Sequence, residues 1–441
     1  MMKKGWVAAV AVAIVIFLGA ISPFVWAADY DIVDINNPFL SKIPTAIPIF
    51  KAVTGSEMEL ELRQGAADML SEMLAFTGYF EILNRRMFLA DPRSPNIVGR
   101  DINFQNWSGI GAELLVTGGI EVQGELLVMD LRLFDTFKAD LVVGKRYRGR
   151  LEDQRRMTRR FCSDVIYALT GSRGIFDSKI AFISTATGHK EVYVCDFDGE
   201  YPTQFTRNNS ITLSPAWSHD GQWLAYTSYV KGRPDLYIRH VREKRGVVVS
   251  RNGVNIAPAW RPKDNVLAAT LSFEGDPEIY LLTESGKITK RLTNSRNIDV
   301  SASWSPDGSQ IAFVSKRAGT PQIYVMDISS GEARRVTFTG KNNTQPAWSP
   351  KGDQIAYTAM DNGHFDVMVI GTDGKGGRKL TGDAGDNESP SWAPDGSLIV
   401  FSSTREGTSK IYVMTAFGTD QRRLIDMPGS QSEPRWSLNF D

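Results

Sequence analysis

The sequence predicts a mixed architecture: a small N-terminal α+β domain followed by an all-β six-bladed β-propeller that the C-terminal strand closes. Three observations support this: a repeat of 43 or 44 residues in the second half, a non-repeating mixed segment before it, and an unpaired tryptophan strand at the end. A repeat of roughly 40 to 45 residues with several short strands is typical of propeller blades. The predicted boundaries are 1–27 for a secretory signal peptide, 28–171 for the α+β domain, 172–177 for a linker and 178–441 for the propeller.

The N-terminal segment has the features of a secretory signal peptide. Lys3 and Lys4 precede an uncharged run over residues 5–28, and Val25-Trp26-Ala27 offers a small-residue cleavage site. The run is also long enough for an uncleaved membrane anchor, which is the alternative. Because Ser22-Pro23 interrupts the run, we favour cleavage after position 27 or 28, and we expect a soluble mature protein in the periplasm.

The segment before the repeat shows both helical and strand patterns. Ser56 and Glu59 predict a capping box at the start of a helix that ends at Gly78. A second helix is predicted over 152–169, with Gly171 as its stop. The predicted strands lie at 79–83, 114–122, 125–134 and 141–148, the last three joined as a meander.

Six tryptophans mark the propeller repeat, and other landmarks keep the same spacing. In the unit that begins at Ser301, the first strand ends at Trp304 and the turn Ser305-Pro306-Asp307-Gly308 follows, with residues that suit a tight turn. One large aromatic per repeat suits packing between blades, and a ring of sugar-binding aromatics is the less favoured alternative. In that unit, the remaining strands centre on Ile311, Tyr324 and Val336. The tryptophans are Trp217, Trp260, Trp304, Trp348, Trp392 and Trp436.

The first blade lacks its own tryptophan strand. The position 44 residues before Trp217 is Arg173, which lies in a predicted loop. The segment Glu433-Pro434-Arg435-Trp436 is a strand of the missing type without a blade of its own. We therefore expect the C-terminal strand to complete the blade that begins at Ile180, which closes the ring and leaves only short exposed edges.

Composition and motifs exclude several classes of protein. With 50 basic and 50 acidic residues, the zero net charge argues against nucleic-acid binding. Cys162 and Cys195 are expected to be separately buried thiols, with a disulfide between the domains as the alternative. Nucleophile-elbow and phosphate-loop motifs are absent, so no catalytic residue and no enzyme is predicted. The four histidines lack metal-ligand spacing and are expected at the surface: His189, His219, His240 and His364.

The loops that lead into the tryptophan strands carry many polar residues. Because each loop has the same place in its blade, we expect them to gather on one face around the central channel. They are interpreted either as ordinary loop formers or as a polar docking ring. Their acidic members also suggest a Ca²⁺ ion at the channel mouth, and no other cofactor or metal is predicted. These acidic residues are Asp299, Asp386, Glu388 and Glu433.

Several motifs resemble the repeats of the TolB family, the periplasmic propellers of the Tol-Pal system: Pro-Ala-Trp-Ser-Pro at 346–350, Trp-Ser-Pro-Asp-Gly at 304–308 and Ile-Tyr-Val-Met-Asp at 323–327. The resemblance implies a non-enzymatic adaptor that binds the lipoprotein Pal and TolA, and that supports outer-membrane integrity and envelope constriction during cell division. Other outer-membrane lipoproteins are further candidate partners, and contact with membranes is expected only through partners. The alternatives are a secreted propeller hydrolase or lyase, or a saccharide-binding module, that uses the acidic mouth.

The resemblance also implies site residues. The family's Pal contacts fall nearest Val254, Ala257, Val300 and Thr344. The full set predicted at the channel mouth is Val254, Asn255, Ala257, Asp299, Val300, Asn343, Thr344, Asn387, Glu388 and Glu433. The TolA-binding arm corresponds to residues 29–37, and an ordinary first strand of the small domain is the alternative; its predicted contacts are Asp29, Tyr30, Asp31, Ile32, Val33 and Asp34.

Overall fold

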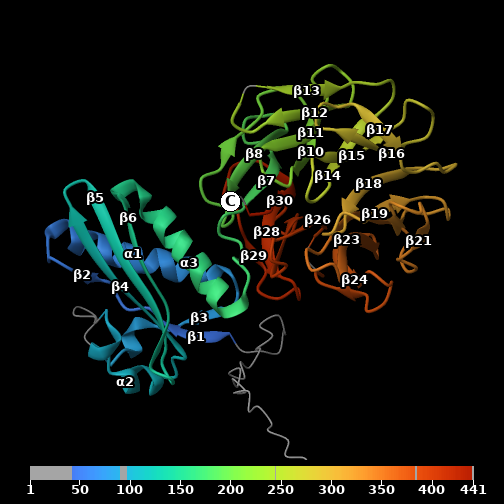
Figure 1. Cartoon of the computed structure of the whole chain (residues 1–441). Helices are drawn as coiled ribbons and strands as arrows, with labels where there is room; N and C mark the ends of the chain where they lie inside the picture. Colours follow the sequence, from blue (N-terminus) through green and yellow to red (C-terminus); the bar gives the residue numbers. More distant parts are fainter. Residues whose placement is uncertain (1–41, 90–96, 244, 383–384, 440–441) are drawn as a thin grey trace, which may run out of the picture.

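The computed structural model describes residues 42–89, 97–243, 245–382 and 385–439 (Figure 1). Within these ranges, a mixed sheet with helices is followed by a ring of six four-stranded sheets, which confirms the predicted fold class. The predicted signal peptide and TolA-binding arm lie outside the described residues. None of the helices in the described ranges is long and apolar enough to cross a membrane.

The N-terminal sheet has the strand order β3-β1-β4-β5-β6, and β2 also pairs with β4. The predicted meander is confirmed, because β4, β5 and β6 pair antiparallel in sequence order. The short strands β1 and β2 were not predicted; both pair in parallel with β4. The strands are β1 (Ile43–Ala46), β2 (Lys51–Ala52), β3 (Phe80–Ile82), β4 (Leu114–Gln123), β5 (Leu126–Asp135) and β6 (Asp140–Arg150). The helices are α1 (Glu57–Phe76), α2 (Phe104–Ser108) and α3 (Gln154–Thr170), with 3-10 turns at η1 (Arg85–Met87), η2 (Gly99–Asp101) and η3 (Leu151–Asp153).

The start of α1 is only half of the predicted capping box. The Ser56 hydroxyl accepts from the Glu59 amide at 3.4 Å, as expected. The Glu59 carboxylate does not return to Ser56; it accepts from the amides of Thr54 and Gly55 and from the Val122 amide on β4. Burial alone would raise the pKa of Glu59, but these hydrogen bonds hold it below its ordinary value. The buried carboxylate therefore joins the helix start to the sheet.

The two parts of the chain share one hydrophobic core. Residues of α1 and α3 cluster with Phe176, Phe197 and Trp436 of the propeller. The Phe197 ring lies edge-on to both Phe76 and Phe176, with centroids 5.5 and 5.2 Å apart. The Arg422 guanidinium donates to the Phe76 carbonyl at 2.6 Å. The small domain is therefore packed directly against the first and last blades.

Each blade is a four-stranded antiparallel sheet, with its tryptophan strand lining the channel (Figure 1). The second and third blades comprise β10 (Thr212–Trp217), β11 (Trp223–Ser228), β12 (Asp235–His240), β13 (Gly246–Val249), and β14 (Asn255–Trp260), β15 (Val266–Leu271), β16 (Glu278–Thr283), β17 (Ile288–Arg291). The fourth and fifth comprise β18 (Asp299–Trp304), β19 (Gln310–Ser315), β20 (Gln322–Asp327), β21 (Ala333–Arg335), and β22 (Asn343–Trp348), β23 (Gln354–Asp361), β24 (His364–Gly371), β25 (Arg378–Lys379). The sixth comprises β26 (Asn387–Trp392), β27 (Leu398–Ser403), β28 (Lys410–Thr415) and β29 (Arg422–Arg423). The strand predicted around Val336 ends one residue earlier, and Val336 itself is buried.

The first blade confirms the predicted closure. Its order is β30-β7-β8-β9, formed by β7 (Lys179–Ser184), β8 (Glu191–Asp196), β9 (Thr203–Gln204) and the C-terminal β30 (Gln431–Trp436). Hydrogen bonds fix the junction beyond the ladder. The Ser437 amide donates to the Lys179 carbonyl at 2.8 Å, and the Trp436 indole donates to the Ser178 hydroxyl at 2.8 Å. The two ends of the propeller are thus joined within a single sheet.

The six tryptophans pack between neighbouring blades, as predicted. All are 6–8% exposed. Trp304 of β18 lies in one cluster with Ile279 of the preceding blade and Phe313 of its own. Its indole Nε1 donates to the Ala259 carbonyl on the preceding inner strand at 3.0 Å. The aromatic repeat therefore holds the ring together and does not form an exposed sugar platform.

The structure confirms one prediction about single residues and corrects another. Cys162 and Cys195 are free, buried thiols. His240 is not at the surface: it is 8% exposed, its Nδ1 accepts from the Glu243 amide at 2.9 Å, and its ring lies edge-on to Trp223. Its strand-end position misled the prediction, because the neighbouring Trp223 covers it. The other three histidines are exposed.

Candidate functional site: the central channel

Every inner strand contains the same break in its pairing. The register with the second strand shifts after the second residue of each inner strand, and the third residue has a positive φ. In five of the six strands a proline follows; since proline has no N–H, this break leaves no donor unpaired at that position. These bulge residues, with φ between 49 and 60°, are Ser214, Ala257, Ser301, Gln345, Ser389 and Glu433.

Some of the bulge residues contact one another around the channel. The Ser214 amide donates to the Glu433 carboxylate at 2.6 Å, and the Ser389 amide donates to the Gln345 side-chain oxygen at 3.0 Å. Each contact joins neighbouring blades. A left-handed conformation costs a non-glycine residue on the order of 1–3 kcal/mol and persists only where the surroundings fix it. The bulges therefore give the channel a constriction whose backbone is held in place.

We call the end of the channel where the inner strands begin the upstream mouth. Four of the predicted mouth residues, Asn255, Asp299, Asn343 and Asn387, are the first residues of their inner strands, and each is at most 1% exposed. The Asn387 amide donates to Asp366 of the preceding blade at 3.3 Å and accepts from Arg405 at 3.0 Å. These four side chains thus brace the blades from inside and are not available to a partner.

The same pattern recurs at the neighbouring positions. The Asn343 amide donates to Gln322 of the preceding blade at 2.9 Å, and the Asn255 amide donates to the Pro234 carbonyl at 3.2 Å. Asp299 is bound within its own blade by the Arg317 guanidinium at 2.8 Å. The two interpretations of the polar loops are therefore resolved residue by residue: the first-strand Asn and Asp side chains serve the fold.

The other six predicted mouth residues remain accessible. Each is partly exposed, and they lie at the starts of β14, β18, β22, β26 and β30 or immediately before them. Two of them, Ala257 and Glu433, also line the central cavity. The structure thus brings together, around one opening, the partly exposed residues Val254, Ala257, Val300, Thr344, Glu388 and Glu433.

The upstream mouth is acidic on one side. Burial raises the pKa of Glu388, and the nearby charges of Asp386 and Glu433 raise it further. In the described part of the chain, however, no three His, Cys, Asp or Glu side chains converge in a way that holds a metal ion. The structure therefore does not form the suggested Ca²⁺ site, because Asp299 is paired with Arg317 and Glu433 is held by Ser214.

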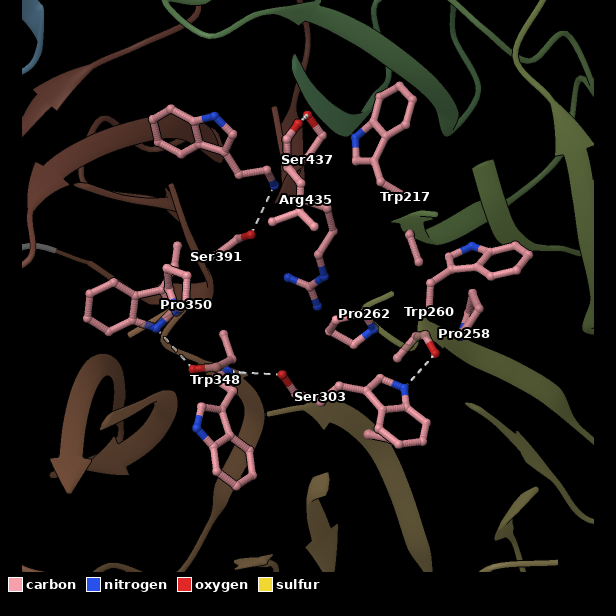
Figure 2. A pocket seen from close by; sticks show the side chains of 18 of the residues that line it. Trp217, Pro258, Trp260, Pro262, Ser303, Trp348, Pro350, Ser391, Arg435 and Ser437 are labelled. Atoms are coloured by element: carbon pink, nitrogen blue, oxygen red, sulfur yellow. Dashed lines mark hydrogen bonds between the residues drawn. The ribbon is translucent and has the colours of Figure 1, made fainter. Parts of the chain in front are cut away.

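Inside the ring, a cavity of about 580 Å³ extends to the opposite end of the channel, which we call the tryptophan mouth (Figure 2). All six inner strands line it. Its rim carries the prolines that follow the tryptophan strands: Pro262, Pro306, Pro350 and Pro394. The cavity is therefore walled by aromatic and proline rings, with few polar groups.

One residue breaks the sixfold pattern of this cavity. The position before the tryptophan is small in five inner strands, Ala216, Ala259, Ser303, Ala347 and Ser391. In β30 it is Arg435, whose guanidinium lies in the middle of the ring (Figure 2). The sequence analysis did not assign Arg435 to a site. The signal was present, because aligning the repeats shows one long cation at a position otherwise occupied by alanine or serine.

The geometry defines a six-bladed propeller whose upstream mouth combines rigid backbone with reachable side chains and shows no catalytic grouping among the described residues. Residues 167–440 match the model of the TolB beta propeller domain, and residues 31–142 match the TolB amino-terminal domain. The chain therefore belongs to the TolB family, whose members are non-enzymatic components of the Tol-Pal system, and the expectation of a non-enzyme is confirmed.

Relatives and a solved structure agree with this assignment. The Tol-Pal system protein TolB of Desulfosudis oleivorans is 57% identical over 268 residues, which is 61% of each chain. The protein of that name from Syntrophus aciditrophicus is 38% identical over 218 residues, or 48% of each chain. The matches thus span about half to three fifths of these relatives. The crystal structure of TolB from Acinetobacter baumannii superposes with a TM-score of 0.78 at 26% identity, covering 90% of this chain and 97% of that one.

Proposed function

We propose that this chain is a periplasmic adaptor that docks the lipoprotein Pal at the upstream mouth of its propeller and engages TolA through residues 29–37. In this role it supports outer-membrane integrity and constriction of the envelope during division. The observation that carries the proposal is the division of labour at the upstream mouth. Buried Asn and Asp side chains brace the blades, while six neighbouring residues stay reachable around the same opening.

The chemistry of this face suits a protein partner. Val254, Ala257 and Val300 supply apolar contact area, and the acidic side around Glu388 and Glu433 favours a basic group on the partner. The docking surface is therefore less polar than the loop composition alone indicates.

Exposed apolar side chains extend this face. Phe338 is 69% exposed in the loop that leads from β21 to β22, and Ile211 and Val230 are exposed beside the start of β10 and the end of β11. Because inner strands begin and second strands end at the same side of each blade, these residues lie on the upstream side. Large apolar groups on one face are a common mark of a protein interface.

The hydrolase, lyase and saccharide-binding alternatives find less support. A catalytic carboxylate needs freedom to meet its substrate, whereas Asp299 is paired with Arg317 and Glu433 is held by the Ser214 amide. The channel tryptophans, which a saccharide site would have to expose, are buried between blades. A rigid docking face is the function that these contacts favour.

The test is the affinity of the mature chain for its cognate Pal, measured by titration calorimetry. Ala257→Arg and Thr344→Arg place long charged side chains at the mouth, and we expect each to weaken binding at least tenfold. Lys263→Ala, at the tryptophan mouth, is the matched control and should bind as the unmodified chain does. Wild-type affinity in both arginine variants would refute the assignment of the mouth, and a mature chain that does not bind Pal would refute the proposed function.

The proposed TolA contact has a separate test. Alternation of Ile32 and Val33 with Asp31 and Asp34 suits an extended segment that adds to the edge of a partner's sheet. Removal of residues 29–37 from the mature chain should abolish binding to the periplasmic part of TolA. Pal affinity should remain, because none of the residues at the upstream mouth is removed. Retained TolA binding would contradict the role of this segment.

A further inference from the structure

Arg435 places a cation in the cavity without a counter-charge. Within the described residues, its only hydrogen bond runs from Nη1 to the carbonyl of the adjacent Pro434, at 3.1 Å. No carboxylate in that part of the chain lies within ion-pairing distance of the guanidinium. The nearest acidic neighbour, Glu433, is held by the amide and hydroxyl of Ser214. Most of the five N–H donors of the guanidinium therefore face the cavity (Figure 2).

Packing does not require this arginine. Alanine or serine fills the same position in the other five inner strands, which close against their neighbours through the same tryptophan contacts. Withdrawal from water lowers the pKa of Arg435, so the fold bears a cost for holding the charge there. A cost of this kind is offset when an anion binds beside the charge.

The walls indicate the class of anion. The rim prolines and the tryptophan rings are apolar, and the hydroxyls of Ser303 and Ser391 already accept from the backbone amides of Trp348 and Trp436 (Figure 2). An inorganic oxyanion would need further donors, which these walls lack. A carboxylate attached to an apolar body would satisfy both parts of the cavity, since guanidinium and carboxylate pair through two parallel hydrogen bonds.

We propose that the cavity at the tryptophan mouth binds an organic carboxylate with an apolar body, held by the Arg435 guanidinium. The volume of about 580 Å³ is within the range of small-molecule sites. The carboxylate comes either from a free small acid or from an acidic ligand group presented at the tip of a larger molecule. This site is distinct from the upstream mouth and does not depend on the binding of Pal.

The test uses benzoate as the probe and benzamide as its uncharged match, titrated into the mature chain and followed by ligand-observed NMR. Benzoate should bind, and benzamide should bind roughly tenfold or more weakly. Arg435→Ala, which installs the side chain found in three sibling strands, should reduce benzoate affinity by roughly tenfold or more, because the paired charge-assisted hydrogen bonds are lost. Arg245→Ala, an exposed arginine on the second blade, is the matched control and should change nothing.

Further arms separate the sources and the alternatives. A short peptide with a C-terminal phenylalanine carboxylate, compared with its amidated form, reports whether a presented carboxylate enters as a free one does; binding of either source with loss in Arg435→Ala supports the proposal. Melting curves establish that Arg435→Ala is folded, and Arg435→Lys, which keeps the charge, should bind benzoate more tightly than Arg435→Ala. Equal binding of benzoate and benzamide, equal binding by the wild type and Arg435→Ala, inorganic phosphate binding as tightly as benzoate, or no binding by either carboxylate source at about 10 mM would each overturn it.

Discussion

The two mouths of the channel are built from the same six strands, yet they differ in what breaks the repeat. At the upstream mouth, the buried first residues repeat closely as Asn or Asp, and the variable positions are those that remain reachable. At the tryptophan mouth, the walls repeat almost fully, and a single residue, Arg435, departs from the pattern. The comparison teaches that repeated positions hold the ring, whereas departures from the repeat mark the places where a ligand is recognised.

The largest expected effect comes from the strand that serves both mouths. Deletion of residues 432–441 removes most of β30, and with it Trp436, Glu433 and Arg435. Because β30 closes the ring through its pairing with β7, we expect the propeller to lose its cooperative melting transition in circular dichroism. Deletion of residues 440–441 alone should leave melting unchanged. A soluble longer truncation with a full-amplitude transition would show that closure is dispensable and that the mouths form without it.

A smaller effect is expected from one tryptophan of the repeated wall. Trp392 is buried between the fifth and sixth blades, and its indole donates to the Ala347 carbonyl at 3.0 Å. Trp392→Ala should lower the free energy of unfolding by about 3–5 kcal/mol, because it leaves a cavity between blades. Denaturant titration measures this change. Phe137→Ala, at an exposed hairpin of the small domain, should cost about 0.5 kcal/mol or less. Similar small losses in both variants would contradict a packing role for the tryptophans.

The buried residues of the upstream mouth should affect stability first. Asn387→Ala removes the amide that bonds to Asp366 and Arg405, and leaves their buried polar groups less well paired. We expect a loss of about 1–3 kcal/mol in the free energy of unfolding. Asn252→Ala, in an exposed loop of the same face, should cost about 0.5 kcal/mol or less. If the folded Asn387→Ala chain kept full stability and lost Pal binding, Asn387 would be a contact residue and the division of labour would be wrong.

The smallest effect concerns a turn beside the tryptophan mouth. Side-chain hydrogen bonds from Ser305 and Ser309 lower the pKa of Asp307 to about 2. Since an unfolded aspartate titrates near about 3.9, ionised Asp307 stabilises the fold above that pH, and this contribution is lost as the pH falls through about 2. Chemical-shift titration should show the low pKa in the wild type and a rise toward about 3.9 in Ser305→Ala. An unchanged pKa in that variant would assign the shift to another cause.

Much of the fold could be predicted because the sequence repeat is also the structural repeat. The tryptophan spacing gives the number of blades, and the interruption at Arg173 with the spare strand at Trp436 gives the closure. The capping box at Ser56 was only half right, since Glu59 finds a partner 63 residues away on β4 that local spacing does not reveal. The parallel strands β1 and β2 were missed because four and two residues carry too little periodicity.

The site was predicted less well, for a physical reason. Asn and Asp are favoured in loops and are also good buried hydrogen-bonding residues, so composition alone does not separate a docking side chain such as Glu388 from a bracing one such as Asn387. The left-handed bulges escape prediction because serine, alanine, glutamine and glutamate occupy them instead of glycine. Their conformation is imposed by contacts between blades, which only the closed ring supplies.

The measurement that tests the central claim most directly is the Pal affinity of Ala257→Arg and Arg435→Ala, compared by titration calorimetry in the same buffer. One variant alters the upstream mouth and the other the tryptophan mouth. If the two mouths are separate sites, Ala257→Arg should bind Pal at least tenfold more weakly, while Arg435→Ala should stay within about twofold of the wild type. An equal loss of Pal affinity in both variants would contradict the account, because it would make the whole channel a single site.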